Sequence, residues 1–232
     1  MNKKGFPIVW GRNGGGFRFA ELKEDHFDEV VHIFKEHYIP NDVILKNLNM
    51  IEDKESMESF CSRLLLTLKN GSSIIAVSRS SQENIAAVLV LRTIDKFDYG
   101  RVTSRTKLVA GRCMKKFTKL KEHIYRQIDY YLKYNCERIL RFYYLCVTPE
   151  YKHIGLGYQM MLTALSVARA NGAGVVVGLF PTFKLQNLAE NLGMKKQYEV
   201  KFSEWEEDGY PGFYARYVRK LCSYGNGNSV LK

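Results

Sequence analysis

A strand that passes through a two-glycine turn directly into a helix is the feature that most limits how this chain can fold. Residues 139–147 are apolar and aromatic, as in a strand, and Thr148-Pro149 ends that run. Gly155 and Gly157 follow, and a helical apolar pattern starts at Gly157. Glycine lets the backbone approach a ligand closely, and the N–H groups and dipole of a helix start attract an anion such as a pyrophosphate. The stretch predicts an anion-binding turn, with a plain strand-to-helix connection as the alternative.

Two widespread phosphate-binding motifs do not fit this turn. A P-loop needs Gly-Lys-Ser/Thr after its glycines, and no such sequence follows here. A dinucleotide fingerprint needs a third glycine, but Met160 stands at that position and no β–α–β unit precedes the turn. The turn must therefore be interpreted from its own surroundings.

Apolar residues elsewhere alternate over short runs or recur at helical spacing, which predicts a mixed α/β (α+β) domain. Further strands are expected at residues 17–21, 72–79, 85–93, 175–180, 198–202 and 213–217, and helices at residues 25–38, 57–68, 117–132, 157–171 and 182–192. No internal repeat or linker interrupts residues 1–222, which are expected to form one domain. Residues 223–232 are rich in Gly, Asn and Ser and are expected to be a flexible tail.

The charge of the chain points to an anionic partner. Its 232 residues include 35 Lys and Arg against 24 Asp and Glu, a net charge of +11. Such an excess suits nucleic acid, a membrane surface or a phosphate-rich cofactor. No apolar run approaches the roughly 20 residues of a membrane span, and the first ten residues lack the apolar stretch of a signal peptide. A soluble, cytoplasmic protein without a membrane partner is expected.

Cysteine and histidine spacing gives no sign of a metal or of disulfides. The five Cys are an odd number without a Cys-x-x-Cys pair, and the five His are scattered without a ligand spacing such as His-Glu-x-x-His. Free thiols and no bound metal are expected. Nucleic-acid binding would rest only on net charge and on the Lys-rich residues 115–121, which a solvated helix face explains equally well, so no nucleic-acid partner is expected.

The turn and the elements after it resemble the GCN5-related N-acetyltransferase superfamily. Its signature is a strand, then Arg/Gln-x-x-Gly-x-Gly/Ala, a helix, a buried strand and a helix ending in Leu-Gly-Phe/Met. The same order occurs here as residues 145–147, Lys152-His153-Ile154-Gly155-Leu156-Gly157, residues 175–180 and Leu192-Gly193-Met194. Lys152 replaces the usual Arg or Gln. Over residues 15–222 the chain is similar to the insect arylalkylamine N-acetyltransferase branch.

This resemblance implies a fold and a cofactor. The fold is a central, mixed, mostly antiparallel sheet of about seven strands flanked by helices, in which the parallel strands 139–147 and 175–180 splay apart to form an acyl-CoA cleft. Acetyl-CoA enters as donor and CoA leaves as product. The implied cofactor-binding residues are the strand residues Leu145, Cys146 and Val147, the turn and helix-start residues Lys152, His153, Ile154, Gly155, Leu156, Gly157 and Tyr158, and Asn187 on a later helix.

The implied reaction transfers an acetyl group to the primary amine of a small, arylalkyl acceptor. The insect branch uses a Glu in an Asp-Glu-Pro-Leu motif as general base, but Ile39 stands at that position here. Glu36 is the expected substitute, with His37 and Asp42 as alternatives. Thr182 keeps a hydroxyl where the branch has a catalytic Ser, and it equally suits a helix N-cap.

Two other functions remain open alongside acetyl transfer. The same cleft would serve an acyltransferase that uses longer acyl-CoA donors. Without the Glu, it would also serve a non-catalytic acyl-CoA-binding protein. The partners expected are acetyl-CoA and a small amine, with the chain a monomer or weak dimer. If strand 139–147 alternates regularly, one of Tyr143 and Tyr144 faces the cleft and the other the core.

Overall fold

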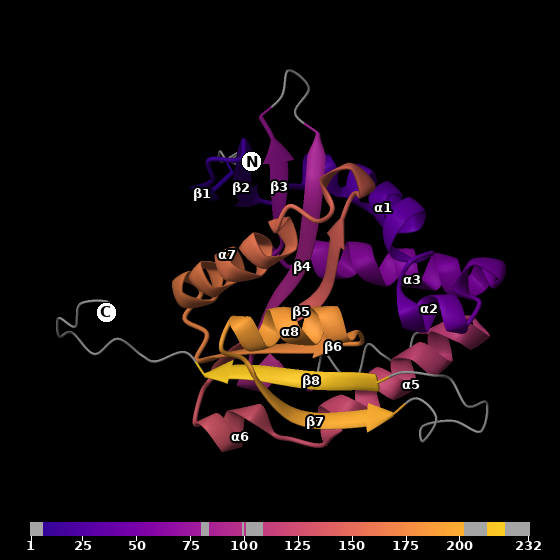
Figure 1. Ribbon diagram of the computed structural model, residues 1–232. Coiled ribbons are helices and arrows are strands. Elements are labelled where there is room, and N and C mark those ends of the chain that lie inside the picture. Colours follow the sequence, from indigo (N-terminus) through magenta and orange to yellow (C-terminus); the bar gives the residue numbers. More distant parts are fainter. Residues whose placement is uncertain (1–6, 80–83, 99, 101–108, 202–212, 221–232) are drawn as a thin grey trace, which may run out of the picture.

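The computed structural model describes residues 7–79, 84–98, 100, 109–201 and 213–220, and an eight-stranded sheet runs through it (Figure 1). The order across the sheet is β1-β2-β3-β4-β5-β6-β8-β7. The strands are β1 (Val9–Arg12), β2 (Phe17–Glu21), β3 (Ile74–Ser78), β4 (Ile85–Asp95), β5 (Arg138–Val147), β6 (Val175–Phe180), β7 (Lys195–Lys201) and β8 (Phe213–Lys220). Within the described residues, β5 and β6 are the one parallel pair, and all other neighbours are antiparallel.

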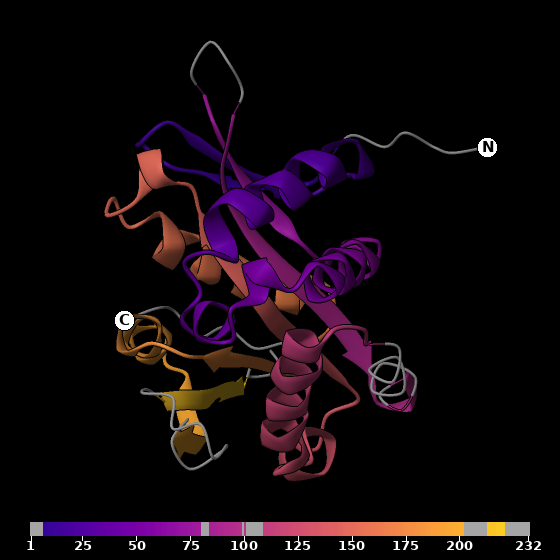
Figure 2. The same cartoon turned by 90° about the vertical axis from the view of Figure 1, so that its right-hand side faces the viewer.

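Helices cover both faces of the sheet (Figures 1 and 2). One core contains α1 (Phe27–Ile33), α2 (Val43–Asn47), α3 (Lys54–Leu68), α5 (Arg112–Arg126) and α6 (Tyr130–Tyr134), and the other contains α7 (Leu156–Ala170) and α8 (Phe183–Asn191). Short helical turns complete the chain: η1 (Glu24–His26), the π-helical η2 (Phe34–Tyr38), η3 (Met50–Glu52), η4 (Lys96–Asp98) and η6 (Pro149–Tyr151). No helix among the described residues is both long and apolar enough to cross a membrane.

Strand alternation explains why there are two cores. Along β4, Val88 and Val90 belong to the core under α1, α3 and α5, whereas Ala87 and Leu89 belong to the core under α7. Side chains of a strand point alternately to opposite faces, so a strand that is apolar throughout needs helices on both sides. The same holds for β6, in which every residue is buried. The mixed fold class expected from the sequence is confirmed.

Two details differ from the sequence-based prediction. β1 adds an eighth strand, pairing with β2 at the edge of the sheet. The helix expected over residues 117–132 is wrong at its end, because α5 stops at Arg126 and α6 begins at Tyr130. Asp129 caps α6 by accepting a hydrogen bond from the Leu132 N–H at 3.0 Å, and the Leu132 side chain is 81% exposed. The expected tail, residues 223–232, lies outside the described residues.

The two parallel strands separate at a β-bulge in β5. Tyr144 is opposite Val90 of β4 and Phe142 is opposite Leu91, so Tyr143 is an extra residue. β5 pairs with β6 through residues 139–142, and the pairing stops where the bulge begins. The expectation that Tyr143 and Tyr144 face opposite sides is wrong, since both pack against the core under α1, α3 and α5.

Gly178 marks the last paired position before the strands diverge. It lies opposite Phe142, and a Cβ atom added to it would come within 2.6 Å of the Phe180 ring and 3.4 Å of the Phe142 Cβ. A side chain at this position would therefore push against two aromatic residues. The absence of a Cβ lets β5 and β6 stay close up to the point where the cleft opens.

Candidate active site

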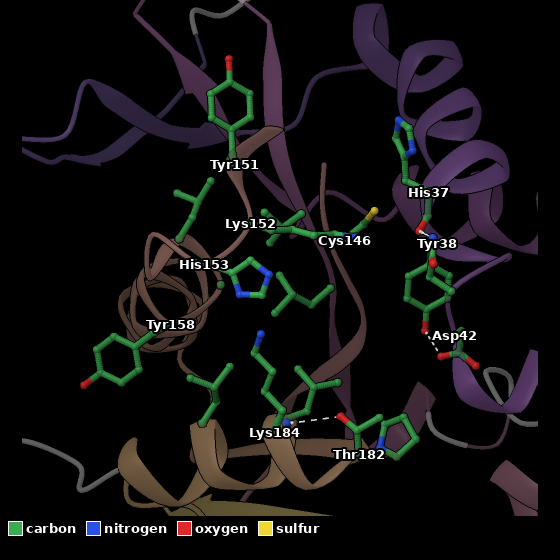
Figure 3. Close-up of a pocket in the computed structure, with 18 of the residues that line it drawn as sticks. His37, Tyr38, Asp42, Cys146, Tyr151, Lys152, His153, Tyr158, Thr182 and Lys184 are labelled. Carbon is green, nitrogen blue, oxygen red and sulfur yellow. Dashed lines mark hydrogen bonds between the residues drawn. The ribbon is translucent and has the colours of Figure 1, made fainter. Parts of the chain in front are cut away.

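A cleft of about 550 Å³ opens where β5 and β6 diverge. Four segments surround it: the end of β5, the turn into α7, the start of α8, and the segment that joins η2 to α2 (Figure 3). A smaller cavity of about 60 Å³ continues the cleft along β5 toward the bulge. The two cavities share the side chains of Tyr38, Asp42, Leu145, Pro181 and Leu185.

The end of β5 offers an unpaired backbone edge to the cleft. Residues 145–147 pair with β4 on one side, while on the other side β6 has already diverged and no other described strand takes its place. An extended ligand can hydrogen-bond to such an edge as if it were a further strand. Cys146 contributes its backbone there, because its thiol is buried in the core and burial raises the pKa of that thiol to about 12.

The turn before α7 has the backbone geometry of an anion site. Gly155 has a φ of 79° and is the N-cap of α7, and His153 has a φ of 67°, which is uncommon for a residue with a side chain. The Gln159 N–H donates to the Gly155 carbonyl, so the N–H groups of residues 156–158 precede the first hydrogen bond of the helix. These groups and the helix dipole favour a negative charge in the cleft.

Basic side chains border the same turn. Lys152 and His153 line the cleft from the turn, and Lys184 extends from α8 toward His153 (Figure 3). A Cβ on Gly155 would meet no atom within 4 Å, so the left-handed backbone and not crowding requires glycine there. Ile154 is 54% exposed, does not line the cleft, and contributes at most its backbone.

The opposite wall of the cleft carries a partly buried carboxylate, Asp42. Its Oδ1 accepts hydrogen bonds from the N–H groups of Ile44 and Leu45, both at 3.0 Å, which makes Asp42 the N-cap of α2. The Tyr38 hydroxyl donates to its Oδ2 at 3.0 Å (Figure 3). Burial raises the pKa of Asp42 above the model-peptide value of 3.8, against the opposing effect of these hydrogen bonds.

The other base candidates lie differently. His37 lines the cleft next to Tyr38, whereas Glu36 is exposed on η2 and does not line it. Ile39, at the position where the insect branch has its Glu, is fully buried in the core. The cleft therefore holds a carboxylate, but three residues further along the chain than the resemblance implies.

Thr182 combines a cap with a position in the cleft. Its hydroxyl oxygen accepts a hydrogen bond from the Leu185 N–H at 3.3 Å, so it is the N-cap of α8, and it also lines the cleft. Asn187 is exposed on α8 and does not line the cleft. Its neighbour Gln186 is buried and donates to the Phe180 carbonyl at 3.0 Å, holding α8 to the end of β6.

Most of the residues implied by the resemblance are thus brought together. Those lining the cleft are Leu145, Cys146, Val147, Lys152, His153, Gly155, Leu156, Gly157, Tyr158 and Thr182, and those not lining it are Glu36, Ile154 and Asn187. Sequence reasoning missed Tyr38 and Lys184. Tyr38 ends η2 and Asp42 precedes α2, so the Tyr38–Asp42 contact forms across the turn between two helices and has no helical-spacing signal in the sequence.

No protein-family model matches the chain, and no curated protein matches it in sequence. Solved structures do match it. A protein of the yellow fever mosquito Aedes aegypti assigned as arylalkylamine N-acetyltransferase 7 aligns with a TM-score of 0.82 at 17% identity, over 95% of this chain and 98% of that one. Arylalkylamine N-acetyltransferase 2 of the same mosquito aligns with a TM-score of 0.79 at 17% identity, over 90% and 99%.

A third structure, the Drosophila melanogaster polyamine N-acetyltransferase that forms N-acetylagmatine, aligns with a TM-score of 0.75 at 16% identity, over 88% of this chain and all of that one. The chain has the N-acetyltransferase fold. The fold expected from the resemblance around Gly155 and Gly157 is confirmed.

Proposed function

We propose that this chain is an acetyl-CoA-dependent N-acetyltransferase that acetylates the primary amine of a small, arylalkyl acceptor. The observation that carries the proposal is one continuous cleft. It runs from the N–H groups at the start of α7, along the unpaired edge of β5, to the carboxylate of Asp42. The proteins of similar structure are, by their names, N-acetyltransferases of arylalkylamines and polyamines, which supports the same reaction class.

The cleft suits the donor along its whole length. The N–H groups of residues 156–158, with Lys152 and Lys184 beside them, fit the pyrophosphate of acetyl-CoA. The backbone of residues 145–147 fits the amide groups of the pantetheine arm, in the manner of an added strand. This arrangement directs the thioester toward Tyr38, Asp42 and the small cavity beyond them. Acetyl-CoA supplies the activated acyl group, and the chain orients it.

Asp42 is our candidate for the general base. The acceptor nitrogen attacks the thioester carbonyl carbon, a C–N bond forms, the C–S bond breaks, and the sulfur leaves as a thiolate. An alkylamine has a pKa near 10.4, so roughly one molecule in a few thousand is neutral at pH 7. A base that takes the amine proton raises the reactive fraction, and the raised pKa of Asp42 makes it a stronger base than an exposed Asp.

The proton and the leaving group need no further side chain. The proton removed from nitrogen passes to Asp42 and from there to solvent, and the thiolate takes a proton from water. A thiol pKa near 8.5 makes the thiolate an acceptable leaving group without an acid. Tyr38 positions Asp42 through its 3.0 Å hydrogen bond.

A non-catalytic acyl-CoA-binding protein is the second candidate. It is favoured by Ile39, which is buried at the position where the insect branch has its Glu. Turnover separates the two candidates. We would measure thiol release from acetyl-CoA with tyramine, dopamine, serotonin, histamine, agmatine and spermidine, and CoA binding by thermal shift on the same sample. Turnover supports the transferase, stabilisation by CoA without turnover supports the binding protein, and the absence of both contradicts the proposed cleft.

A further inference from the structure

The small cavity of about 60 Å³ lies in the gap between the diverging strands β5 and β6. Residues 142–145 of β5 and residues 179–181 at the end of β6 line it, and these are the positions where the pairing of the two strands ends and the residues that follow. Its lining includes Tyr38, Asp42 and Leu185, which also line the wide cleft, so the two cavities adjoin at these side chains.

The cavity reaches both cores of the sheet. Tyr38 and Tyr144, on the side of Asp42, pack against the core under α1, α3 and α5. The opposite wall is formed by Leu89, Phe142 and Met161, which belong to the core under α7. A group that enters from the wide cleft at Asp42 therefore crosses the plane of the sheet and ends against α7.

The wall on the α7 side is apolar and buried. Met161 is fully buried, and Leu89 is 1% exposed. Among the described residues that line the small cavity, Asp42 is the one carboxylate, and it stands at the junction with the wide cleft. A charged group pushed past it would lose its water without gaining a partner, which costs free energy. The inner part of the cavity therefore suits an uncharged hydrocarbon chain.

The size of the cavity restricts what this chain can be. An apolar cavity of about 150 Å³ takes up benzene, which corresponds to about 25 Å³ for each carbon atom. A cavity of about 60 Å³ accordingly holds about two or three carbon atoms. The ring of an arylalkyl acceptor is too large for it and fits the wide cleft of about 550 Å³ instead.

From this geometry we infer that the small cavity holds the acyl chain of the donor, that it admits propionyl and butyryl groups as well as acetyl, and that Met161 sets the upper limit of chain length. The inference rests on the proposed function, because the pantetheine arm along β5 brings the thioester to the junction of the two cavities. Each further methylene group that is buried against the apolar wall should increase donor affinity about fourfold, until Met161 blocks the chain.

Binding of inert donor analogues tests this inference without requiring turnover. The full chain would be titrated calorimetrically with CoA and with its S-ethyl, S-propyl, S-butyl and S-hexyl thioethers. These have the chain lengths of acetyl-, propionyl-, butyryl- and hexanoyl-CoA but carry no group that can be transferred. We expect the affinity to rise by up to about fourfold with each carbon from S-ethyl to S-butyl, and S-hexyl-CoA to bind about tenfold more weakly than S-butyl-CoA.

Met161→Ala should move the limit, because it shortens the side chain at the end of the cavity. In this variant S-hexyl-CoA should bind at least as tightly as S-butyl-CoA. Met160→Ala is the matched control, since Met160 is fully buried in the same core on the same helix but lines neither cavity. It loses the same side-chain atoms and should keep the wild-type order. The wild-type series needs no variant, so the limit is tested even where Met161→Ala fails to fold.

An affinity that does not change with chain length would overturn the inference, and so would wild-type binding of S-hexyl-CoA as tight as that of S-butyl-CoA. An equal shift of the limit in Met160→Ala would remove Met161 from its role. Failure of the proposed function looks different. CoA itself would then not bind, or the predicted length series would appear in a chain that releases no thiol from acetyl-, propionyl- or butyryl-CoA with any amine.

Discussion

Replacing Asp42 by Asn separates its two roles, because Asn keeps the cap and loses the base. Asn is as good an N-cap as Asp, so the hydrogen bonds from Ile44 and Leu45 should persist and α2 should stay folded. General-base catalysis contributes about 10²- to 10⁴-fold, so kcat should fall by that factor, or about 3–5 kcal/mol in the activation barrier. Asp42→Ala should behave differently, losing the cap as well at about 1 kcal/mol of stability.

The raised pKa of Asp42 predicts how both the stability and the kcat of the chain change with pH. Since the pKa of Asp42 is raised in the folded chain, ionising this group disfavours the folded state, and stability should fall as pH rises above 3.8. Asp42→Asn should remove that slope from urea unfolding measured across this range. In the wild type kcat should rise with pH as Asp42 loses its proton, and Asp42→Asn should flatten that rise.

Matched variants make the assay decisive. Asp129→Asn is the control, because Asp129 also caps a helix but lies exposed on α6, away from the cleft, and should keep wild-type kcat. Glu36→Gln tests the rival carboxylate on η2. An Asp42→Asn chain with wild-type kcat and an unchanged pH profile would refute the reasoning, and loss of activity in Glu36→Gln would move the base there.

Three further changes test the rest of the cleft. Gly155→Glu puts a negative charge into the anion-binding turn and should abolish the thermal shift produced by CoA. Gly155→Ala adds only backbone strain of about 1–2 kcal/mol and should make that thermal shift smaller. Unchanged CoA affinity in Gly155→Glu would disprove the role of the turn. Thr182→Ala should cost about 1 kcal/mol in urea unfolding while Thr182→Ser does not, and equal stability of the two would exclude the cap. Gly178→Ala pushes a methyl group to within 2.6 Å of the Phe180 ring, so it should lower stability by about 1–3 kcal/mol and weaken CoA binding; a wild-type Tm would contradict this packing.

The spacing of residues in the sequence predicted the anion-binding turn, because neighbouring residues of the chain form it. The turn at Gly155 and Gly157 depends on residues adjacent in the chain, so its backbone conformation and its place before α7 could be inferred from the sequence. The break between α5 and α6 had a local signal as well, in the capping Asp129, although the apolar spacing on either side concealed it.

The acceptor end depends on contacts between distant residues. Tyr143 is an extra residue only relative to the β4 register, and a bulge of this kind leaves no mark in the β5 sequence. Lys121 reaches Tyr144 across the packing of α5 on the sheet, so neither residue identifies the other in the sequence. The sequence identifies Asp42 as one of several carboxylates near the expected base position. The structure favours Asp42 over Glu36 as the general base because Asp42 lines the cleft, whereas Glu36 is exposed on η2 and does not line it.

The extra residue in β5 also reverses the odd–even rule of that strand. Before it, the even-numbered Leu140 and Phe142 face α7, and after it the odd-numbered Leu145 packs on that side while the even-numbered Cys146 faces the opposite core. A chain lacking Tyr143 would keep one parity throughout, and because the deleted residue is the extra one, Tyr144, Leu145 and Cys146 would stay on the faces that they occupy here. Homologues that lack only this residue would therefore keep the cleft-facing side chains beyond it and lose one aromatic side chain from the small cavity, whereas a deletion elsewhere in β5 would turn the later side chains to the opposite faces.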